Sequence, residues 1–261
     1  MSAIKEKLLQ LGIRPSRGLG QHFLIDKRIA VRQVEAAEIT EEDTVLEIGP
    51  GLGILTSEIV ERAGKTIVIE KDTVLSNYLS QEFSERLEII RGDVLDIELP
   101  SFDKVISNIP FNISSPLTFK LLEENFECGV LMYQKEYARR MTAKSGEKNY
   151  SRLSVMTSIK SNITKLFDVS RNSFYPPPRV DATVVKIEPS EPGFELGHPD
   201  LFARVVRELF NYRRKKIKNA LEYGFNIKLS PDIPYGDKRV EKLSPKEISS
   251  LVDHMVDKGL F

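Results

Sequence analysis

The sequence contains little cysteine, no tryptophan and few histidines. Its 261 residues include one cysteine, Cys128, so an intramolecular disulfide is impossible and a thiolate metal cluster is disfavoured. Cys128 opens the apolar run CGVLMY, which predicts a buried structural thiol rather than a reactive one. The three histidines, His22, His198 and His254, are scattered and show no metal-ligand spacing. We therefore predict that the protein has no metal site.

Long apolar segments are also missing. No hydrophobic run approaches the length of a membrane-spanning helix, and the N-terminal stretch MSAIKEKLLQLGIRPSRG lacks the apolar core of a signal peptide. We therefore expect a cytoplasmic protein without a membrane partner. Hydrophobic residues make up 41% and charged residues 29%, as in ordinary globular chains. The length suits one large domain, or a domain with a small appendage, and nothing in the sequence demands more than a monomer.

The formal net charge is zero, which by itself argues against a nucleic-acid partner. The charges are unevenly distributed, however. Residues 204–218 hold seven basic residues and one acidic residue, and residues 135–152 hold six and two. Together the two stretches carry +10, so the rest of the chain carries −10. Clustered basic residues on a neutral protein indicate a defined basic face. A solvated helix face is the alternative interpretation.

Most of the chain alternates short apolar runs with amphipathic helical patterns. This alternation predicts βαβ units and a mostly parallel sheet. The last two predicted strands have no helix between them, which favours an antiparallel pair at one sheet edge. The predicted strands cover residues 44–49, 66–70, 87–93, 103–108, 129–134, 164–170 and 183–189.

A change of composition marks a domain boundary. Residues 189–199, PSEPGFELGHP, hold three prolines and two glycines and show no periodicity, which predicts a linker. From residue 200 the apolar residues follow a helical stripe through residues 220 and 221, and 244-SPKE predicts a capping box at a helix start. We therefore predict one domain over residues 1–188, a linker over 189–198 and a small helical domain over 199–261.

Three glycines stand between a predicted strand and a predicted helix. Gly49, Gly51 and Gly53 would let the turn close tightly and let a ligand approach the backbone. Their spacing is G-x-G-x-G rather than the G-x-G-x-x-G of dinucleotide binders, and Pro50 removes a backbone donor that a pyrophosphate would use. A nicotinamide-dependent oxidoreductase is therefore disfavoured, and a purely structural turn stays open as an alternative.

Acidic residues end the next two predicted strands. Glu70 follows TIVI and could accept from both hydroxyls of a ribose, and Asp93 follows IIRG and could accept from an adenine amine. Each alone would more often be a surface acid at a strand end. Because ligands of open α/β sheets lie across the carboxyl ends of the strands, the combination predicts an adenosine-bearing cofactor without a pyrophosphate. S-adenosyl-L-methionine fits this description best.

The fourth of these strands ends in 108-NIPF. The Asn108 side chain and the Ile109 carbonyl could accept from an exocyclic adenine amine and orient its lone pair toward a methyl donor. Pro110 would stiffen the turn, and Phe111 could stack on the purine. A strand-end turn followed by a core phenylalanine is the structural alternative for this tetrapeptide.

The motifs together resemble the ribosomal RNA adenine N6,N6-dimethyltransferase family, which modifies two adjacent adenosines near the 3′ end of small-subunit rRNA. The resemblance rests on NIPFNISSPL, 18-GLGQHFLID, 47-EIGPGLG, 134-QKEYARRM, 148-KNYSRLSV and 174-FYPPPRVDA, and it covers residues from about 14 to 185. Lengths and loops look closest to archaeal members. His22 and Phe111 stand where many relatives have asparagine and tyrosine.

The resemblance implies a fold and a set of site residues. It implies an α/β Class I SAM-dependent methyltransferase fold, Rossmann-like, with a seven-stranded sheet that has one antiparallel strand, plus a small C-terminal helical domain. Phe174 would help to sandwich the target base, although from the residues alone it would be a core residue. The implied or predicted cofactor contacts are His22, Leu24, Gly49, Gly51, Gly53, Glu70, Asp93 and Asn108.

The resemblance also gives the basic stretches a partner, which is the small-subunit rRNA or a pre-30S-type ribosomal particle. Two other functions stay open: a non-catalytic ribosome-assembly factor and a large-subunit rRNA adenine N6-methyltransferase. The residues predicted to bind RNA phosphates are Arg139, Arg140, Lys144, Lys148, Arg204, Arg207, Arg213, Arg214, Lys215 and Lys216.

Overall fold

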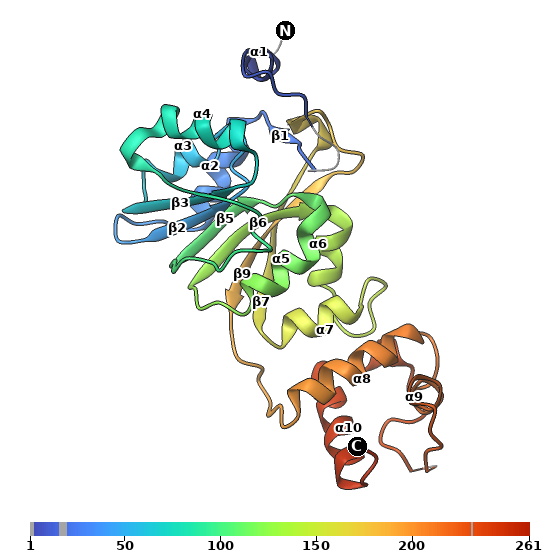
Figure 1. Cartoon of the computed structure of the whole chain (residues 1–261). Coiled ribbons are helices and arrows are strands. Elements are labelled where there is room, and N and C mark those ends of the chain that lie inside the picture. The colour runs from blue at the N-terminus through green and yellow to red at the C-terminus, as the bar shows by residue number, and fades with distance from the viewer. Residues whose placement is uncertain (1–2, 16–19, 231) are drawn as a thin grey trace. The chain divides into compact units, whose positions relative to one another are not determined.

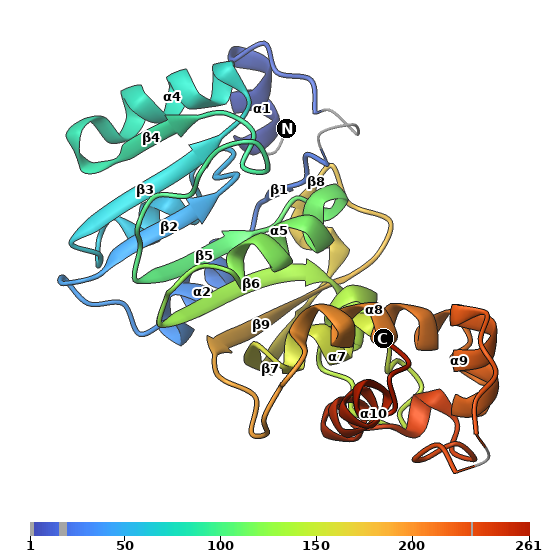
Figure 2. The ribbon, with the colours of Figure 1, turned by 60° about the horizontal axis from the view of Figure 1, so that its bottom comes forward.

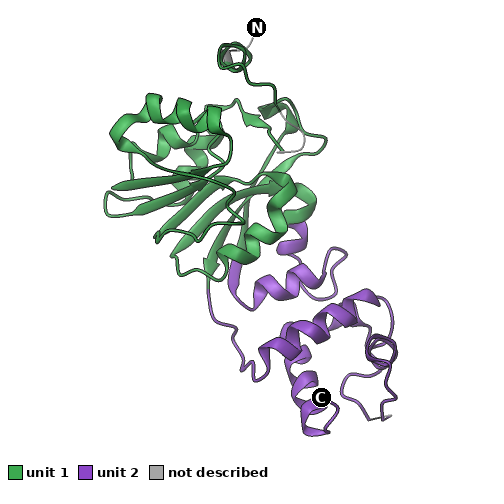
Figure 3. Ribbon diagram, in the orientation of Figure 1, with its two compact units in different colours: residues 1–138, 163–189 green, residues 139–162, 190–261 purple. Residues whose placement is uncertain are grey.

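The computed structural model describes residues 3–15, 20–230 and 232–261. By its internal contacts the chain divides into two compact units, coloured separately in Figure 3. Unit 1 comprises residues 1–138 and 163–189, and unit 2 comprises residues 139–162 and 190–261. Within the described residues, no helix combines the length and the apolarity needed to cross a lipid bilayer.

A seven-stranded sheet forms the centre of unit 1 (Figure 1). Strands β2, β3, β4, β5 and β6 pair in parallel, and β9 runs antiparallel to β6, which confirms the predicted mixed sheet. All seven predicted strands are present, with bounds that differ from the predicted ones by a few residues. In spatial order they are β4 (Glu88–Arg91), β3 (Lys65–Glu70), β2 (Thr44–Ile48), β5 (Lys104–Asn108), β6 (Cys128–Gln134), β9 (Ala182–Pro189) and β7 (Ser161–Val169).

Helices cover both faces of the sheet (Figure 2). On one face Ile29 of α2 and Leu55 beside α3 pack against Ile106 and Val130 of the sheet, and α5 lies on the other face. The predicted structural thiol is confirmed, because Cys128 is buried and its pKa is raised by burial. The helices of unit 1 are α1 (Ala3–Gln10), α2 (Lys27–Ala36), α3 (Thr56–Ile59), α4 (Thr73–Phe83), α5 (Ser114–Leu121) and α6 (Lys135–Met141), of which α6 extends past residue 138; the 3-10 turns are η1 (Ser84–Arg86), η2 (Phe111–Ile113) and η3 (Arg171–Ser173).

A two-stranded sheet that the sequence analysis did not predict lies beside the main sheet in the fold of unit 1. β1 (Phe23–Leu24) pairs antiparallel with β8 (Phe174–Tyr175), with Leu24 opposite Phe174. The pairing joins segments that are far apart in the sequence. Strands of two residues have no readable alternation, so only the tertiary fold reveals them.

Unit 2 is helical around its own apolar cluster, and its helices bury the predicted stripe. The predicted capping box is confirmed, because Ser244 Oγ accepts from the Glu247 N–H and Glu247 accepts from the Ser244 N–H at 2.9 Å. The elements are α7 (Arg152–Ser158), α8 (Pro199–Asn211), α9 (Ile217–Phe225), η4 (Val240–Lys242) and α10 (Pro245–Asp257).

Two details of unit 2 differ from the predictions. The single helical stripe expected from residue 200 to 221 is wrong between Asn211 and Ile217, where residues 212–216 form a turn. Residues 139–162 cluster with unit 2, whereas the predicted domain of residues 1–188 included them. The physical reason is that Tyr150, Val155 and Ile159 are buried among the apolar residues of α8 and α10. The exact domain boundaries stay a prediction.

Candidate active site

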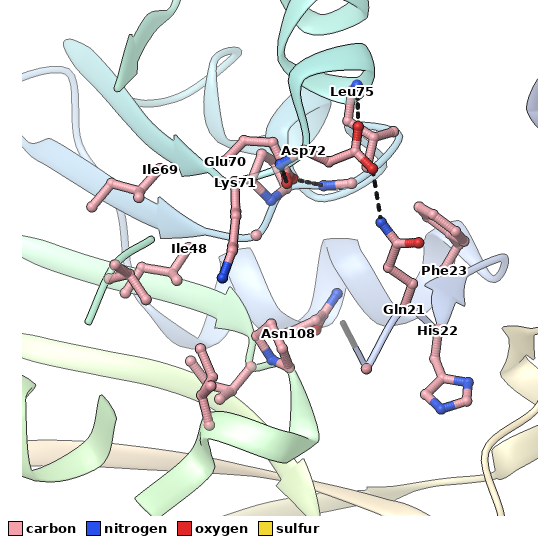
Figure 4. Close-up of a pocket in the computed structure, with 18 of the residues that line it drawn as sticks. Gln21, His22, Phe23, Ile48, Ile69, Glu70, Lys71, Asp72, Leu75 and Asn108 are labelled. Carbon is pink, nitrogen blue, oxygen red and sulfur yellow. Dashed lines mark hydrogen bonds between the residues drawn. The ribbon is translucent and has the colours of Figure 1, made fainter. Parts of the chain in front are cut away.

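A cavity of about 190 Å³ lies in unit 1 at the carboxyl ends of β2, β3, β4 and β5. The close-up in Figure 4 shows Glu70 and Asp72 on one side, Asn108 across from them, and Gln21, His22 and Phe23 along a third side. This is the edge at which open α/β sheets bind ligands. Of the predicted catalytic and cofactor-binding residues, all but Gly53 line the cavity: His22, Leu24, Gly49, Gly51, Glu70, Asp93, Asn108, Ile109, Pro110, Phe111 and Phe174.

The glycine turn closes one end of the cavity. Gly49 has φ +66°, and a Cβ there would lie 3.3 Å from Pro110 Cγ, so the turn packs directly against the 108–111 loop. The Gly51 N–H donates to Glu70 Oε2 at 3.3 Å. Gly53 does not line the cavity; a Cβ there would lie 2.7 Å from Phe83 of α4. Gly53 therefore serves the packing of the turn against α4.

The carboxylate of Glu70 is buried and held by backbone donors. Its Oε1 accepts from the Asp72 N–H at 2.8 Å and its Oε2 from the Gly51 N–H. Burial raises the pKa of Glu70, and these hydrogen bonds oppose the shift. Each oxygen of a carboxylate can accept a second hydrogen bond. Glu70 can therefore receive hydroxyl donors from a ligand in the cavity.

Asp93 lies at the predicted position but already has partners. Lys71 Nζ donates to Asp93 Oδ2 at 2.6 Å, and the Leu95 N–H donates to Asp93 Oδ1 at 3.0 Å. The hydrogen bond from Lys71 lowers the pKa of Asp93, so this carboxyl is ionised at neutral pH. Lys71 also lines the cavity and was not among the predicted site residues. An adenine amine would share Asp93 with Lys71.

Asn108 holds an unsatisfied acceptor at the cavity. Its Oδ1 is buried and has no hydrogen-bond partner in the described part of the chain. The neighbouring groups are engaged, because Ser107 Oγ donates to the Ile48 carbonyl at 2.6 Å and the Ile109 N–H donates to the Met132 carbonyl at 3.2 Å. A buried acceptor without a partner costs about 1–3 kcal/mol. A donor from a ligand in the cavity would remove this cost.

Two aromatic rings border the same cavity. Phe111 lies in η2 and is half-buried, with its ring centroid 6.0 Å from that of His22. Phe174 is buried in the β1–β8 pair, and His22 Nδ1 lies 2.7 Å from the Pro176 carbonyl oxygen. The β1–β8 pair thus brings His22 and Phe174 to the 108–111 loop. Of the motif that begins at Gly18, Gly18 and Leu19 lie outside the described residues.

A buried network anchors the segment that follows Phe111. The Ser114 hydroxyl donates to the Phe111 carbonyl at 3.2 Å, and the Thr118 hydroxyl donates to the Ser114 carbonyl at 2.7 Å. The hydroxyl oxygens of Thr118 and Tyr133 are 2.9 Å apart, and the Tyr137 hydroxyl donates to Thr118 Oγ1 at 3.2 Å. The network connects the start of α5 to β6 and α6, so it restrains the position of Phe111.

A buried acid supports the glycine turn from behind. Thr56 Oγ1 donates to Glu47 Oε2 at 2.6 Å, which ties the end of β2 to the start of α3. Burial, together with a smaller contribution from the nearby Glu70 carboxyl, raises the pKa of Glu47 to about 8. Glu47 belongs to the EIGPGLG motif, yet the sequence analysis gave it no role. An acid inside an apolar strand was the signal that could have found it.

All ten residues predicted to bind RNA lie in unit 2. Arg213 connects the two basic stretches, because its guanidinium donates to the carbonyls of Glu147 at 3.2 Å and Lys148 at 2.6 Å. Lys216 pairs with Asp237 at 2.7 Å and Arg207 with Glu208 at 3.0 Å. Arg204 lies over the rings of Phe225 and Phe261. The remaining predicted residues are exposed: Arg139, Arg140, Lys144, Lys148, Arg214 and Lys215.

Comparisons with known proteins match almost the whole chain. The family model described as ribosomal RNA adenine dimethylase matches residues 14–255. A probable ribosomal RNA small subunit methyltransferase A from Thermococcus gammatolerans is 43% identical, over 97% of this chain and 94% of its own length. The counterpart from Pyrococcus abyssi is also 43% identical, over 95% and 94%.

Solved structures show the same fold. A dimethyladenosine transferase from Plasmodium falciparum has a TM-score of 0.78 and 33% identity, covering 91% of this chain and 98% of that one. The 23S rRNA methyltransferase ErmE has a TM-score of 0.71 and 26% identity, covering 90% and 99%. At this coverage each match includes most of both units.

Proposed function

The chain belongs to the ribosomal RNA adenine dimethylase family, and from this premise we propose that it dimethylates the N6 amine of adenosine in small-subunit rRNA. The proposed targets are two adjacent adenosines near the 3′ end of that RNA, and the proposed role is in small-subunit biogenesis. The observation that carries the proposal is the buried, unpartnered Asn108 Oδ1 on a cavity that Phe111 and Phe174 also line.

The cavity suits S-adenosyl-L-methionine. Bound there, this cofactor would supply an electrophilic methyl group on a positively charged sulfur. Glu70 and Asp93 offer carboxylate oxygens for hydroxyl and amine donors, and the glycine turn removes the side chains that would fill the space. Apolar residues such as Ile48 and Ile69 also line the cavity. These residues would hold an adenosine with a short charged tail.

The residues around Asn108 would orient the target amine. Asn108 Oδ1 would accept from one amine N–H, and the Ile109 carbonyl would accept from the other, so that the lone pair of the nitrogen points away from both. Phe111 and Phe174 would hold the base between them, which requires the adenine to leave its stack in the RNA. The proton of the alkylated nitrogen is acidic and can leave to water, so the reaction needs no dedicated side-chain base.

Unit 2 would bind the RNA through phosphate contacts of its exposed basic residues. The proposed partner is small-subunit rRNA within a pre-30S-type particle, and the proposed location is the cytoplasm. We propose that the protein acts as a monomer, since nothing in the sequence demands more than one chain. These assignments rest on the family and on the position of the basic residues in unit 2.

The experiment that tests the proposed function maps the product. The purified full chain is incubated with methyl-labelled S-adenosyl-L-methionine and unmodified small-subunit or large-subunit rRNA, and nucleosides are analysed by mass spectrometry. We expect N6,N6-dimethyladenosine at two adjacent positions of the small-subunit RNA. Methylation of the large-subunit RNA alone would establish that alternative, which the similarity to ErmE makes worth testing.

A chain that binds cofactor and RNA but forms no methylated adenosine would be an assembly factor without catalysis. A thermal-shift comparison of NAD and S-adenosyl-L-methionine checks the cofactor independently of any RNA. We expect only the second compound to raise the unfolding temperature, because binding to the folded state alone stabilises it. A shift with NAD would contradict the cofactor assignment.

A further inference from the structure

Unit 2 exposes an aromatic ring on a helix that is otherwise well packed. Tyr223 lies on α9 and is 60% exposed. On the same helix Ile217, Ala220 and Leu221 are fully buried, so the packing of α9 does not depend on the Tyr223 ring. A single exposed aromatic ring is ordinary on a protein surface, although tyrosine is enriched at binding interfaces. The groups around Tyr223 therefore decide what this ring can bind.

A lysine without an ion pair lies over the ring. Lys215 Nζ is 5.0 Å from the centroid of Tyr223, and Lys238 Nζ is 5.0 Å from the centroid of Tyr235. Lys238 also pairs with Glu247 at 2.6 Å. Lys215 forms no ion pair with any residue that the structure describes. Both lysines thus contact a tyrosine ring, but the charge of Lys238 is neutralised by Glu247 and that of Lys215 is not.

Tyr212 and Arg214 belong to the same turn after α8 as Lys215. The Tyr212 ring lies 5.7 Å from that of Tyr223 at an interplanar angle of 39°. Arg214 is exposed and has no carboxylate partner among the residues with described positions. Residues 212–215 and Tyr223 thus combine two rings with three cations, of which Arg213 pairs with Glu241 at 3.4 Å and the other two have no ion pair among the described residues. The turn that interrupts the predicted helix brings these groups together.

Acidic residues near Tyr223 are engaged elsewhere. Glu222 accepts from the Leu229 N–H at 3.1 Å, and Glu208 pairs with Arg207 at 3.0 Å. Neither therefore neutralises Lys215. An exposed ring beside lysine and arginine side chains without ion pairs among the described residues matches single-stranded nucleic acid, whose bases stack on aromatic rings while its phosphates contact cations.

We propose that Tyr223 is a stacking platform for an unpaired RNA nucleobase, with the adjoining phosphate held by Arg214 and Lys215. The proposal rests on the proposed function for its RNA partner, and it adds a base-contacting site in unit 2 that lies outside the cavity of unit 1. Stacking does not depend on the identity of the base, so the site would hold unpaired RNA without reading its sequence.

The test compares two variants that differ only in the aromatic ring. Tyr223→Phe keeps the ring and Tyr223→Leu removes it. Binding of a short single-stranded oligoadenylate to the full chain is measured by fluorescence anisotropy over a range of salt concentrations. An abasic oligomer with the same number of phosphates serves as the second probe. We expect Tyr223→Leu to weaken oligoadenylate binding about tenfold, and Tyr223→Phe to stay within about twofold of the wild type.

The controls separate stacking from charge and from unfolding. Tyr223→Leu should bind the abasic oligomer as the wild type does, and its salt slope should be unchanged because it contacts no phosphate. Arg214→Ala should lower the slope by about one for both probes. The thermal midpoint of Tyr223→Leu should equal that of the wild type, because the side chain is exposed.

Equal binding of oligoadenylate by Tyr223→Leu and the wild type would overturn the proposal, as would an equal loss for both probes. The proposal would also be overturned if Tyr223→Leu bound an acidic peptide more weakly than the wild type but bound RNA equally well. That result would indicate a protein partner. Formation of dimethyladenosine is measured separately on the same variants. If the wild type forms none but the ring-dependent binding persists, the proposed function fails while this inference stands.

Discussion

In unit 1 the side chain of Asn108 keeps a buried acceptor without a partner, whereas in unit 2 the buried hydroxyl of Tyr150 donates to the Leu243 carbonyl at 2.8 Å. Unit 1 surrounds a cavity with acids, glycines and rings, and unit 2 closes an apolar cluster and carries free cations outside it. On the proposed function, unit 1 would carry out the methyl transfer and unit 2 would bind the RNA. Changes in each unit should therefore affect different measurements.

The largest effect is expected at Asn108. Asn108→Ala should lower the kcat of methyl transfer about 10³-fold, because the amine loses the acceptor that orients it. Affinity for S-adenosyl-L-methionine, measured by calorimetry, should stay within about threefold, and RNA affinity should not change.

The matched control for Asn108 is Gln33, another buried amide of unit 1 without a hydrogen-bond partner in the described structure, but one that does not line the cavity. Gln33→Met should leave kcat unchanged. Near-normal turnover in Asn108→Ala would remove the basis for assigning chemistry to unit 1.

A smaller effect is expected from the free cations of unit 2. Arg214→Ala combined with Lys215→Ala should weaken RNA binding about 30-fold at moderate salt and lower the salt slope by about two, because two phosphate contacts are lost. The kcat at saturating RNA should stay unchanged.

Lys216→Ala is the control, since Lys216 already pairs with Asp237 at 2.7 Å. Lys216→Ala should lower the salt slope of RNA binding by less than Arg214→Ala alone or Lys215→Ala alone. Equal slopes for all variants would show that the basic turn is only solvated.

Two glutamates, Glu47 in unit 1 and Glu247 in unit 2, should contribute to the pH dependence of stability with opposite signs. Burial raises the pKa of Glu47 to about 8, so the folded state retains a proton that the unfolded state loses. The associated stability is fully present below the ordinary glutamate pKa and is lost as the pH rises through about 8. Glu47→Gln should therefore gain about 4 kcal/mol relative to the wild type between pH 5 and pH 9, as measured by urea unfolding.

Glu247 in unit 2 provides the opposite case. Partial burial opposes ionisation, but hydrogen bonds from Lys238 and Ser244 dominate and lower the pKa of Glu247. Its stability is present above the ordinary glutamate pKa and is lost as the pH falls through the lowered value. Glu247→Gln should have a lower free energy of unfolding than the wild type at neutral pH. This difference should disappear as the pH falls into the acid range. The free energy of unfolding of each variant relative to the wild type should therefore change with pH in opposite directions. A change in the same direction for both variants would contradict the contrast between a buried neutral glutamate and an ion-paired one.

The smallest effect is expected from two buried tyrosine hydroxyls. Tyr133→Phe in unit 1 and Tyr150→Phe in unit 2 should each cost about 1 kcal/mol of stability, because each removes one buried hydrogen bond. Only Tyr133→Phe should lower kcat, about tenfold, because its network restrains Phe111 through Thr118 and Ser114. The KM for the cofactor should stay constant in both. Equal kcat values would show that the network is only structural.

Much of unit 1 was predictable because its signals are local. The seven strands are short apolar runs separated by helical patterns, and all of them form one sheet. The predicted groups at the strand ends, Glu70, Asp93 and Asn108, also line one cavity, because parallel strands end at the same edge of the sheet. Gly53 was the exception, since the sequence cannot tell a glycine that faces a ligand from one that faces Phe83.

Other features could not be predicted because they depend on distant partners. The β1–β8 pair joins segments near opposite ends of unit 1, and the ion pair of Lys71 with Asp93 bridges two strand ends. Residues 212–216 form a turn, although the apolar residues on both sides of it follow helical spacing. There the Ile217 N–H donates to the Lys238 carbonyl at 2.9 Å, a contact that no local pattern encodes.

The amino-acid order alone determined the kind of sheet, the glycine turn, the acids and the amide at successive strand ends, and the family, because each depends on residues close in sequence. Only the tertiary structure decided which of these groups are left without partners. Whether Asn108 keeps a free acceptor, or Lys215 a free charge, depends on neighbours that folding brings from elsewhere in the chain. The availability of a group for a ligand is a property of its three-dimensional surroundings.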